Sequence, residues 1–153
     1  MEDELNQTLC FTIPFKKEQR SALLAVHILY STIVCEQEIE KGNSIDAIIQ
    51  NVGNVVDKIK KAGTTGSYTL VYKEMLMFYE ALYIIRRLAY TKAIQNTLTG
   101  LSENKDPDFI QRASKYYSET CNEILSFCNE TFCNDPDFQL IRNTVELEYE
   151  RQN

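Results

Sequence analysis

The chain has 153 residues, of which 44% are hydrophobic, and this is enough for one domain with a sizeable core. Its 22 acidic residues outnumber its 16 basic ones, which argues against nucleic acid as a partner, because a nucleic-acid-binding surface is basic. No apolar run approaches the roughly 18 residues of a membrane-spanning helix, so we expect no membrane partner.

The N-terminal part predicts little regular structure before a long helix. Residues 1–15 carry few periodic signals and Pro14 ends any helix before it, so they predict a tail or a short helix. Residues 16–153 predict a single all-helical domain. Its first helix is predicted from Lys16 to about Lys41, because apolar residues recur there at helical spacing without an interior glycine or proline.

Two more helices are predicted in the middle of the chain. One follows the N-cap residue Ser44 and ends at Gly63, with an apolar stripe along one side. The next runs from Tyr68 to about Leu98 and is apolar nearly all round. A helix of this kind is buried on all sides, so we expect it at the centre of the bundle.

The same helix-start pattern occurs twice in the C-terminal third, as Asp106-Pro107-Asp108-Phe109 and Asp135-Pro136-Asp137-Phe138. Aspartate is a good N-cap, proline has no N–H to leave unsatisfied in the first turn, and the second aspartate is favourable at the positive end of the helix dipole. These patterns predict a helix from Pro107 to about Phe132 and another from Pro136 onward. The predicted fold is therefore all-α, an antiparallel bundle of about five to six helices.

Candidates for catalysis and metal binding are weak. His27 is the only histidine and lies between apolar neighbours without a specified acid–base partner. Cys121, Cys128 and Cys133 include no Cys-x-x-Cys pair, so we interpret them as small buried hydrophobic residues. We predict no enzyme activity, no metal and no cofactor. The odd number of cysteines and the lack of a signal-peptide pattern predict reduced thiols and a cytoplasmic location.

Two groups of side chains leave alternatives open. Arg86 and Arg87 lie toward the end of the third predicted helix, where cations favour the helix dipole, and the alternative is an anion site. Four tyrosines are spaced along one side of that helix, and they either pack in the core or line a peptide groove: Tyr68, Tyr72, Tyr79 and Tyr83.

Three stretches resemble the 14-3-3 family, in the order in which that family has them. Residues 18–27, Glu-Gln-Arg-Ser-Ala-Leu-Leu-Ala-Val-His, resemble the opening of its third helix, Glu-Glu-Arg-Asn and then Leu-Leu-Ser-Val-Ala-Tyr. Residues 55–57 and 67–75 resemble its Leu-Leu-Asp, its Ser/Gly loop and its Lys-Val-Phe-Tyr-Tyr-Lys-Met. Residues 140–144, with Tyr149-Glu150 after them, resemble its Leu-Ala-Leu-Asn-Phe-Ser-Val-Phe-Tyr-Tyr-Glu.

The resemblance implies a right-handed stacking of helices and an adaptor that binds peptide segments of partner proteins. In the family these segments carry phosphoserine or phosphothreonine. A homodimer is a further prediction, although residues 1–15 are too short to form the family's usual two-helix dimerisation arm. The family's peptide-binding Asn matches Asn143, with Glu150 behind it. A one-residue shift of the alignment adds Lys73 to the predicted peptide-binding residues.

The residues that hold the phosphate in the family are replaced here. Its Lys and first Arg fall on Leu29 and Glu36, and its Arg-Tyr pair falls on Ala81 and Leu82, which puts dependence on phosphate in question. The alternative prediction is a helical host-interaction protein of a virus or microbe. Such a protein binds its partners through a hydrophobic groove without phosphate.

Overall fold

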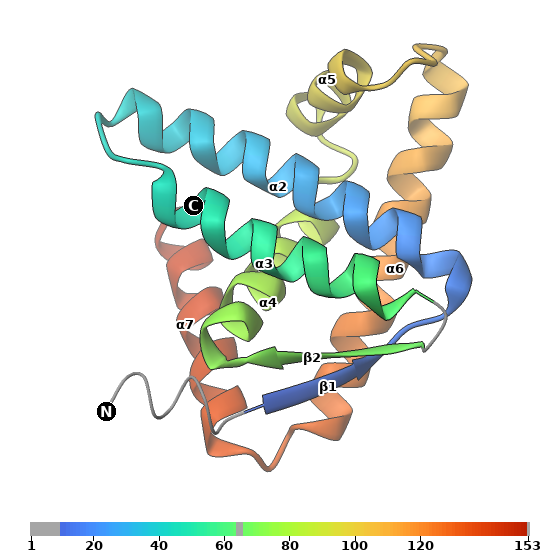
Figure 1. The fold of residues 1–153 in the computed structure, drawn as a ribbon. Helices are drawn as coiled ribbons and strands as arrows, with labels where there is room; N and C mark the ends of the chain where they lie inside the picture. Colours follow the sequence, from blue (N-terminus) through green and yellow to red (C-terminus); the bar gives the residue numbers. More distant parts are fainter. Residues whose placement is uncertain (1–9, 64–65, 153) are drawn as a thin grey trace.

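The structure is a computed structural model that describes residues 10–63 and 66–152, with side chains described up to residue 150 (Figure 1). Over these residues the chain forms six α-helices and one two-stranded sheet, which confirms the predicted all-α helical bundle. The elements follow in the order β1 (Cys10–Pro14), a 3₁₀ turn (Lys17–Gln19), α2 (Arg20–Glu40), α3 (Asp46–Ala62), β2 (Ser67–Val71), α4 (Tyr72–Leu88), α5 (Lys92–Leu101), α6 (Pro107–Thr131) and α7 (Pro136–Gln152).

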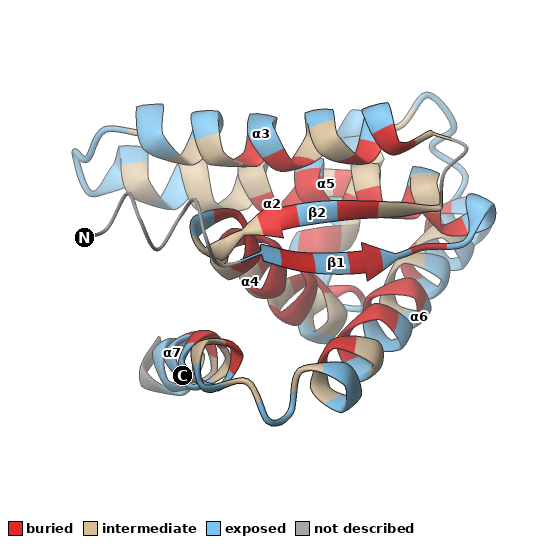
Figure 2. Ribbon diagram, turned by 60° about the horizontal axis from the view of Figure 1, so that its bottom comes forward, coloured by how far each residue is buried: buried red, intermediate tan, exposed pale blue. Residues whose placement is uncertain are grey.

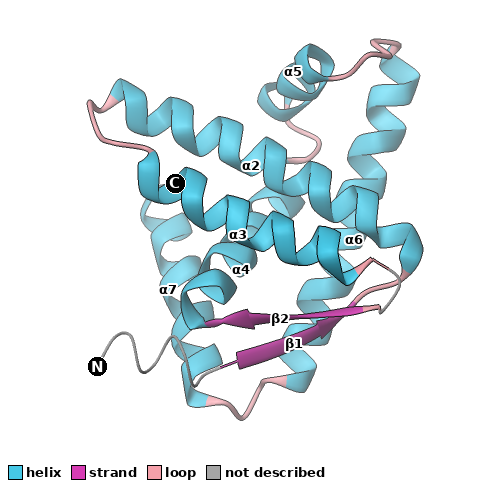
Figure 3. Ribbon diagram, in the orientation of Figure 1, coloured by secondary structure: helices cyan, strands magenta, loops and turns pink. Residues whose placement is uncertain are grey.

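The strands β1 and β2 are antiparallel neighbours, although they are far apart in the sequence (Figure 3). Phe11 lies opposite Leu70, and Ile13 lies opposite Tyr68. These four side chains are buried, while the residues between them are less buried or exposed, which is the period of two expected for a sheet with one covered face.

The two strands correct the predictions for these segments. A tail or short helix was expected over residues 1–15, but residues 10–14 form a strand, and residues 1–9 lie outside the described part of the chain. A helix was expected from Tyr68, but residues 67–71 also form a strand, so the mostly helical domain contains one small sheet. Both strands are only five residues long, and their alternation is too short to stand out against neighbouring helical patterns.

The first predicted helix begins at Arg20 rather than at Lys16, after the 3₁₀ turn. Gln19 fixes this entry, because its Oε1 accepts a hydrogen bond from the Lys16 backbone N–H at 2.9 Å. Its Nε2 donates to Oε2 of Glu123 at 2.6 Å, which attaches the start of α2 to α6.

Helix α4 lies at the centre of the bundle, as its all-round apolar sequence predicts, and it packs against the sheet and against α2, α3, α6 and α7. It is antiparallel to α6, since Tyr79 lies beside Asn129 while Ser118 Oγ donates to the Arg86 carbonyl at 3.3 Å. Helix α7 runs in the same direction as α4. The ring of Tyr79 contacts Phe138, and the ring of Tyr83 four residues later contacts Tyr149.

A buried carboxylate fixes the start of α4. Glu74 accepts a hydrogen bond from the Val71 backbone N–H at 3.0 Å, which satisfies a free N–H of the first turn. It also accepts from Nζ of Lys58 on α3 at 2.5 Å. One side chain therefore connects the end of β2, the first turn of α4 and the last turns of α3.

The third predicted helix is divided in two. It ends as α4 at Leu88, and a new helix, α5, begins at Lys92. Thr91 is the N-cap of α5, because its Oγ1 accepts a hydrogen bond from the Ile94 N–H at 3.4 Å and donates to the Leu88 carbonyl at 2.6 Å. No glycine or proline marks this break, so the prediction of one continuous helix to Leu98 is wrong.

The two Asp-Pro-Asp-Phe patterns begin helices as predicted. Oδ1 of Asp106 accepts a hydrogen bond from the Asp108 N–H at 3.1 Å at the start of α6. Oδ1 of Asp135 accepts from the N–H groups of Asp137 and Phe138, at 2.9 Å and 3.3 Å, at the start of α7. Both aspartates therefore act as N-caps.

The buried side chains form one core cluster that includes residues of both strands and of all six helices. Figure 2 shows that the buried positions of β1, β2, α4 and α6 lie toward one another, while α3 and α7 keep an exposed outer side. Helix α5 contributes least, since Ile94 and Leu98 are its buried residues.

One segment passes a simple test for a membrane-spanning helix. Residues Lys17–Glu40 are long and apolar enough by length and composition, although the sequence contains no long uninterrupted apolar run. A mostly buried core helix and a signal sequence pass the same test. In this fold α2 packs against α3, α4 and α6 and buries Leu23, Val26 and Leu29, and 33% of the tested window is buried.

Candidate functional site

Two adjacent hollows lie where α2, α5 and the first half of α6 meet. The hollow nearer α5 has a volume of about 280 Å³, and the one nearer the start of α2 has a volume of about 340 Å³. Phe109 and Tyr117 of α6 line both hollows, so the two lie side by side. Together we call them the α2–α5–α6 groove.

Each of the three helices contributes one stripe of residues to this groove. Helix α2 supplies a row at spacings of three and four residues, namely Ser21, Ala25, Ile28 and Leu29. The end of α5 supplies Leu98, Leu101 and Ser102. Helix α6 supplies Phe109, Arg112, Ala113, Tyr116 and Tyr117, which follow the same helical spacing.

The groove is distinguished by large apolar side chains that remain open to solvent. Ile28 and Leu101 are each 53% exposed, and Phe109 and Tyr116 are each 36% exposed. Single exposed apolar residues are common on protein surfaces, but a connected set from three helices indicates a binding surface. Phe109 and Tyr116 have the helical spacing of core residues, and the structure places them in the groove instead.

A third hollow, of about 550 Å³, lies between the end of β1 and α6. Its large apolar side chains are already buried or half-buried, as for Phe15, Ile124 and Phe127. Gln19 and Glu123, which hydrogen-bond to each other, lie at its edge. Ile28 and Leu101 of the α2–α5–α6 groove are more exposed than these apolar side chains, so that groove is the stronger candidate.

The groove has one charged lining residue, Arg112. Its Nε donates a hydrogen bond to the Asp108 backbone carbonyl at 3.4 Å, and within the described part of the chain it forms no ion pair. Lys105, near the α5 end of the groove, is different. Its Nζ donates to the carbonyls of Thr99 and Ser102, at 2.8 Å and 3.2 Å, at the C-terminal end of α5.

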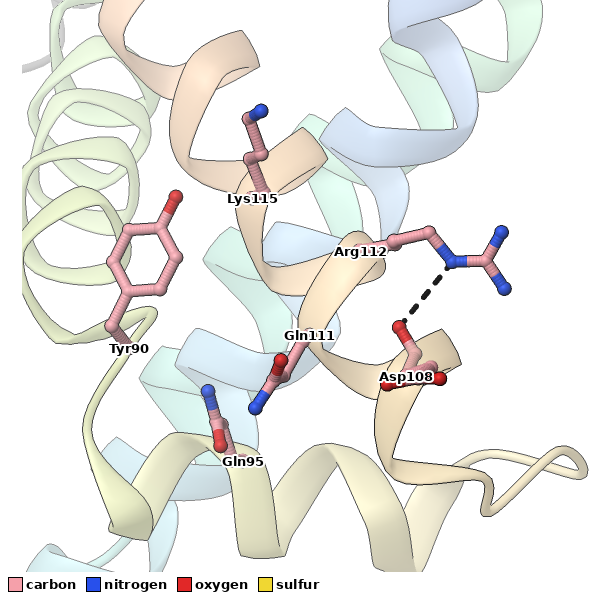
Figure 4. Close-up of a pocket in the computed structure, with 6 residues that line it drawn as sticks. All are labelled: Tyr90, Gln95, Asp108, Gln111, Arg112 and Lys115. Carbon is pink, nitrogen blue, oxygen red and sulfur yellow. Dashed lines mark hydrogen bonds between the residues drawn. The ribbon is translucent and has the colours of Figure 1, made fainter.

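A broader polar hollow of about 820 Å³ lies on the other side of α6, next to the α4–α5 turn (Figure 4). It is lined by Tyr90, Gln95, Asp108, Gln111, Arg112 and Lys115. Figure 4 shows Gln95 and Gln111 pointing toward one another, while the guanidinium of Arg112 points away from Tyr90. The exposed ridge of α6 therefore separates an apolar groove from a polar hollow, and Arg112 lies on this ridge.

The sequence-predicted peptide-binding residues lie elsewhere. Asn143 and Glu150 are exposed on α7 and lie seven residues apart, so they share one face of that helix. This face points away from Phe138 and Ile141, which pack into the core. Lys73 is exposed in the first turn of α4. None of the three lines a hollow described above.

His27 is completely buried on α2. Its Nδ1 lies 2.7 Å from the Leu23 carbonyl oxygen, while its Nε2 has no partner among the described residues. Burial lowers the pKa of His27 to about 4, although the hydrogen bond to Leu23 opposes this shift. The imidazole is therefore neutral at pH 7 and does not face a solvent-accessible site.

The cysteines differ in burial, and Cys35 is intermediate. Cys121 and Cys128 are buried, as predicted, and burial raises the pKa of each thiol to about 12. Cys133 was expected to be buried but is exposed, because it follows the last turn of α6. Cys10 is also exposed. Within the described residues no group of three His, Cys, Asp or Glu side chains is placed to hold a metal ion.

The two arginines at the end of α4 contact aromatic rings. The guanidinium carbon of Arg87 lies 4.8 Å from the centre of the Tyr83 ring and 5.1 Å from that of Tyr149. Arg86 lies 5.4 Å from the centre of the Tyr83 ring. The contact between Arg87 and Tyr149 joins α4 to α7. Of the four tyrosines assigned to one helix face, Tyr68 lies in strand β2 instead, and Tyr79 stacks on Tyr83.

Comparison with protein-family models, with curated proteins and with solved structures gave no match. The resemblance to the 14-3-3 family therefore stays a prediction. The function proposed below rests on the geometry of the α2–α5–α6 groove.

Proposed function

We propose that the chain is a protein-interaction module that binds a helical segment of a partner protein in the α2–α5–α6 groove, without a requirement for phosphate. The observation that carries this proposal is the connected set of exposed apolar side chains, centred on Ile28, Leu101 and Phe109. An adaptor function agrees with both functions that the sequence suggests.

The lining of the groove suits a helix. Three helices contribute to it, and the residues of α2 and α6 that line it recur at spacings of three and four. An amphipathic helix binds such a surface by placing its own apolar residues, spaced by three and four, between those of the walls. Burial of apolar surface from water supplies the main favourable free energy.

The charge of the groove disfavours phosphate as the main determinant. A phosphoserine carries close to two negative charges, and its recognition normally uses several cationic donors. The groove lining supplies one, Arg112. The predicted residues Lys73, Asn143 and Glu150 lie on other surfaces and add no further cation to it.

The test begins with selection of binders from a displayed library of amphipathic helical peptides, followed by fluorescence-polarisation titration. We expect Ile28→Glu to weaken binding of a selected peptide by about tenfold or more, because it places a charge opposite an apolar face. Ile39→Glu is the matched control. Ile39 is also an exposed isoleucine, on the same side of α2, but about 16 Å further along the helix.

A second pair of variants tests whether the loss of peptide binding is specific to substitutions in α2. Leu101→Glu alters the α5 wall, and Leu140→Glu alters a similarly exposed leucine on α7. Circular dichroism checks that all four variants fold. The proposal is wrong if no peptide is selected, or if selected peptides bind the Ile28→Glu and Leu101→Glu variants as well as the unaltered chain.

A phosphopeptide experiment separates the two candidate adaptor functions. An Arg-rich phosphoserine peptide and its unphosphorylated twin are titrated against the same protein. We expect no preference for the phosphorylated form. Binding that requires the phosphate would replace our proposal with the phosphopeptide adaptor that the sequence resemblance implies.

A further inference from the structure

We infer that the partner segment carries an acidic side chain beside its apolar face, and that this carboxylate pairs with Arg112 in the α2–α5–α6 groove. The inference rests on the proposed function and names the chemistry of the partner. It predicts an amphipathic helix with a glutamate or aspartate placed next to the apolar residues that enter the groove.

The position of Arg112 supports this inference. It lies three residues after Phe109 and four before Tyr116, so its side chain leaves α6 on the same side as two exposed rings of the groove. A helix that covers these rings therefore passes close to the guanidinium. One N–H of the guanidinium, at Nε, is used by the Asp108 carbonyl, and the planar group offers further donors to a carboxylate.

The other two cations near the groove, Lys105 and Lys115, are not placed to pair with a bound carboxylate. Lys105 is engaged by two carbonyls at the end of α5. Lys115 lines the polar hollow on the opposite side of the α6 ridge, where it lies 3.9 Å from a carboxylate oxygen of Glu119. Arg112 is thus the cation that the groove presents to a bound segment, within the part of the chain that the structure describes.

The net charge of the chain makes this contact selective. The protein carries a formal charge of −6, so an acidic segment is repelled by the molecule as a whole. An acidic partner is favoured only if its carboxylate reaches the local positive charge at Arg112. We therefore expect acidic residues at one defined position of the partner helix, and no general preference for acidic peptides.

The experiment uses four forms of the folded chain to select from the same library of helical peptides, in which the apolar positions are fixed and the flanking positions vary. The four forms are the unaltered chain, Arg112→Gln, Arg112→Glu and Lys115→Glu. Lys115→Glu is the control, because it reverses a charge on the same helix outside the groove. Sequencing of the selected peptides reports the residue preferred at each flanking position.

On the unaltered chain, we expect one flanking position to be enriched in glutamate or aspartate. Arg112→Gln should remove this preference, and Arg112→Glu should replace it with lysine or arginine. Lys115→Glu should leave it unchanged. For a purified peptide, exchange of that glutamate for glutamine should weaken binding to the unaltered chain about fivefold, and this difference should shrink at high salt.

The outcomes distinguish this inference from the proposed function. If peptides bind in the groove, as shown by sensitivity to Ile28→Glu, but show no acidic position or keep it in Arg112→Glu, the inference is wrong and the proposed function stands. If no selected peptide is sensitive to Ile28→Glu, both are wrong.

Discussion

The imidazole of His27 stacks on the ring of Phe78, with the ring centroids 5.6 Å apart and the planes inclined by 20°. The contact joins α2 to the central helix α4 inside the core. It places a titratable group where water does not reach, since His27 has no exposed surface.

We therefore predict that protonation of His27 destabilises the fold. The pKa of His27 is 6.5 in the unfolded chain and about 4 in the folded one. Between these pH values, His27 is mostly protonated in the unfolded state and mostly neutral in the folded state. Stability should fall as the pH drops from about 6.5 to about 4, by roughly 3 kcal/mol in total. Urea unfolding at a series of pH values measures this loss.

The control for this prediction is His27→Leu, which removes the titratable group and fills the same place in the core with an apolar side chain of similar size. Other titrating groups contribute to both proteins, so the difference between the two pH profiles isolates the histidine. A leucine variant whose stability falls as steeply as that of the unaltered chain over this range would contradict the assignment.

Glu74 should stabilise the fold through two separate contacts. Glu74→Ala removes both the hydrogen bond to the Val71 N–H and the ion pair with Lys58, and we expect a loss of about 2 kcal/mol in the free energy of unfolding. Glu74→Gln keeps an acceptor for the N–H but loses the ion pair, so we expect about half that loss. Chemical denaturation measures both. Equal losses would show that the hydrogen bond to Val71 contributes nothing.

Arg87 should stabilise the packing of α7 on α4, because it contacts Tyr149 of α7 as well as Tyr83 of its own helix. We expect Arg87→Ala to lower the free energy of unfolding by about 1 kcal/mol, because cation–π contacts at partly exposed sites are each worth a fraction of this. Lys92→Ala, which removes an exposed cation at the start of the next helix, serves as the control. Thermal unfolding of the two variants should differ, and identical midpoints would argue against the cation–π contribution.

The cysteines should differ in their reactivity toward a thiol reagent. Cys10 and Cys133 are exposed and should react rapidly in the folded protein. Cys121 and Cys128 are buried with raised pKa values, and should react only when the protein unfolds. Mass spectrometry after timed labelling identifies the modified residues. Rapid labelling of Cys121 or Cys128 under native conditions would contradict the packing of α6.

The predictable parts of the fold are those with local chemistry. Asp106 and Asp135 begin helices because each aspartate caps the backbone within three residues, and sequence alone contains that information. The strands depend on a partner more than fifty residues away, as Phe11 and Leu70 show. The break between α4 and α5 was missed because Thr91 caps the new helix without a glycine or proline nearby.

The candidate site was less predictable than the fold. Ile28, Phe109 and Tyr116 have the helical spacing of core residues, and Ile110 next to them is indeed buried. Which of these apolar side chains remains open depends on how α5 lies against α2 and α6. That arrangement follows from contacts between helices and leaves no periodic signal in the sequence.

Helix α5 forms one wall of the groove but is attached to the core mainly through Ile94 and Leu98. A segment with few buried contacts moves at a small cost in free energy, so we expect the spacing between this wall and α2 to adjust to what lies between them. Segments with side chains of different bulk can then occupy the same surface in turn. We therefore expect several partners to compete for this surface with moderate affinity, rather than one partner to bind it tightly.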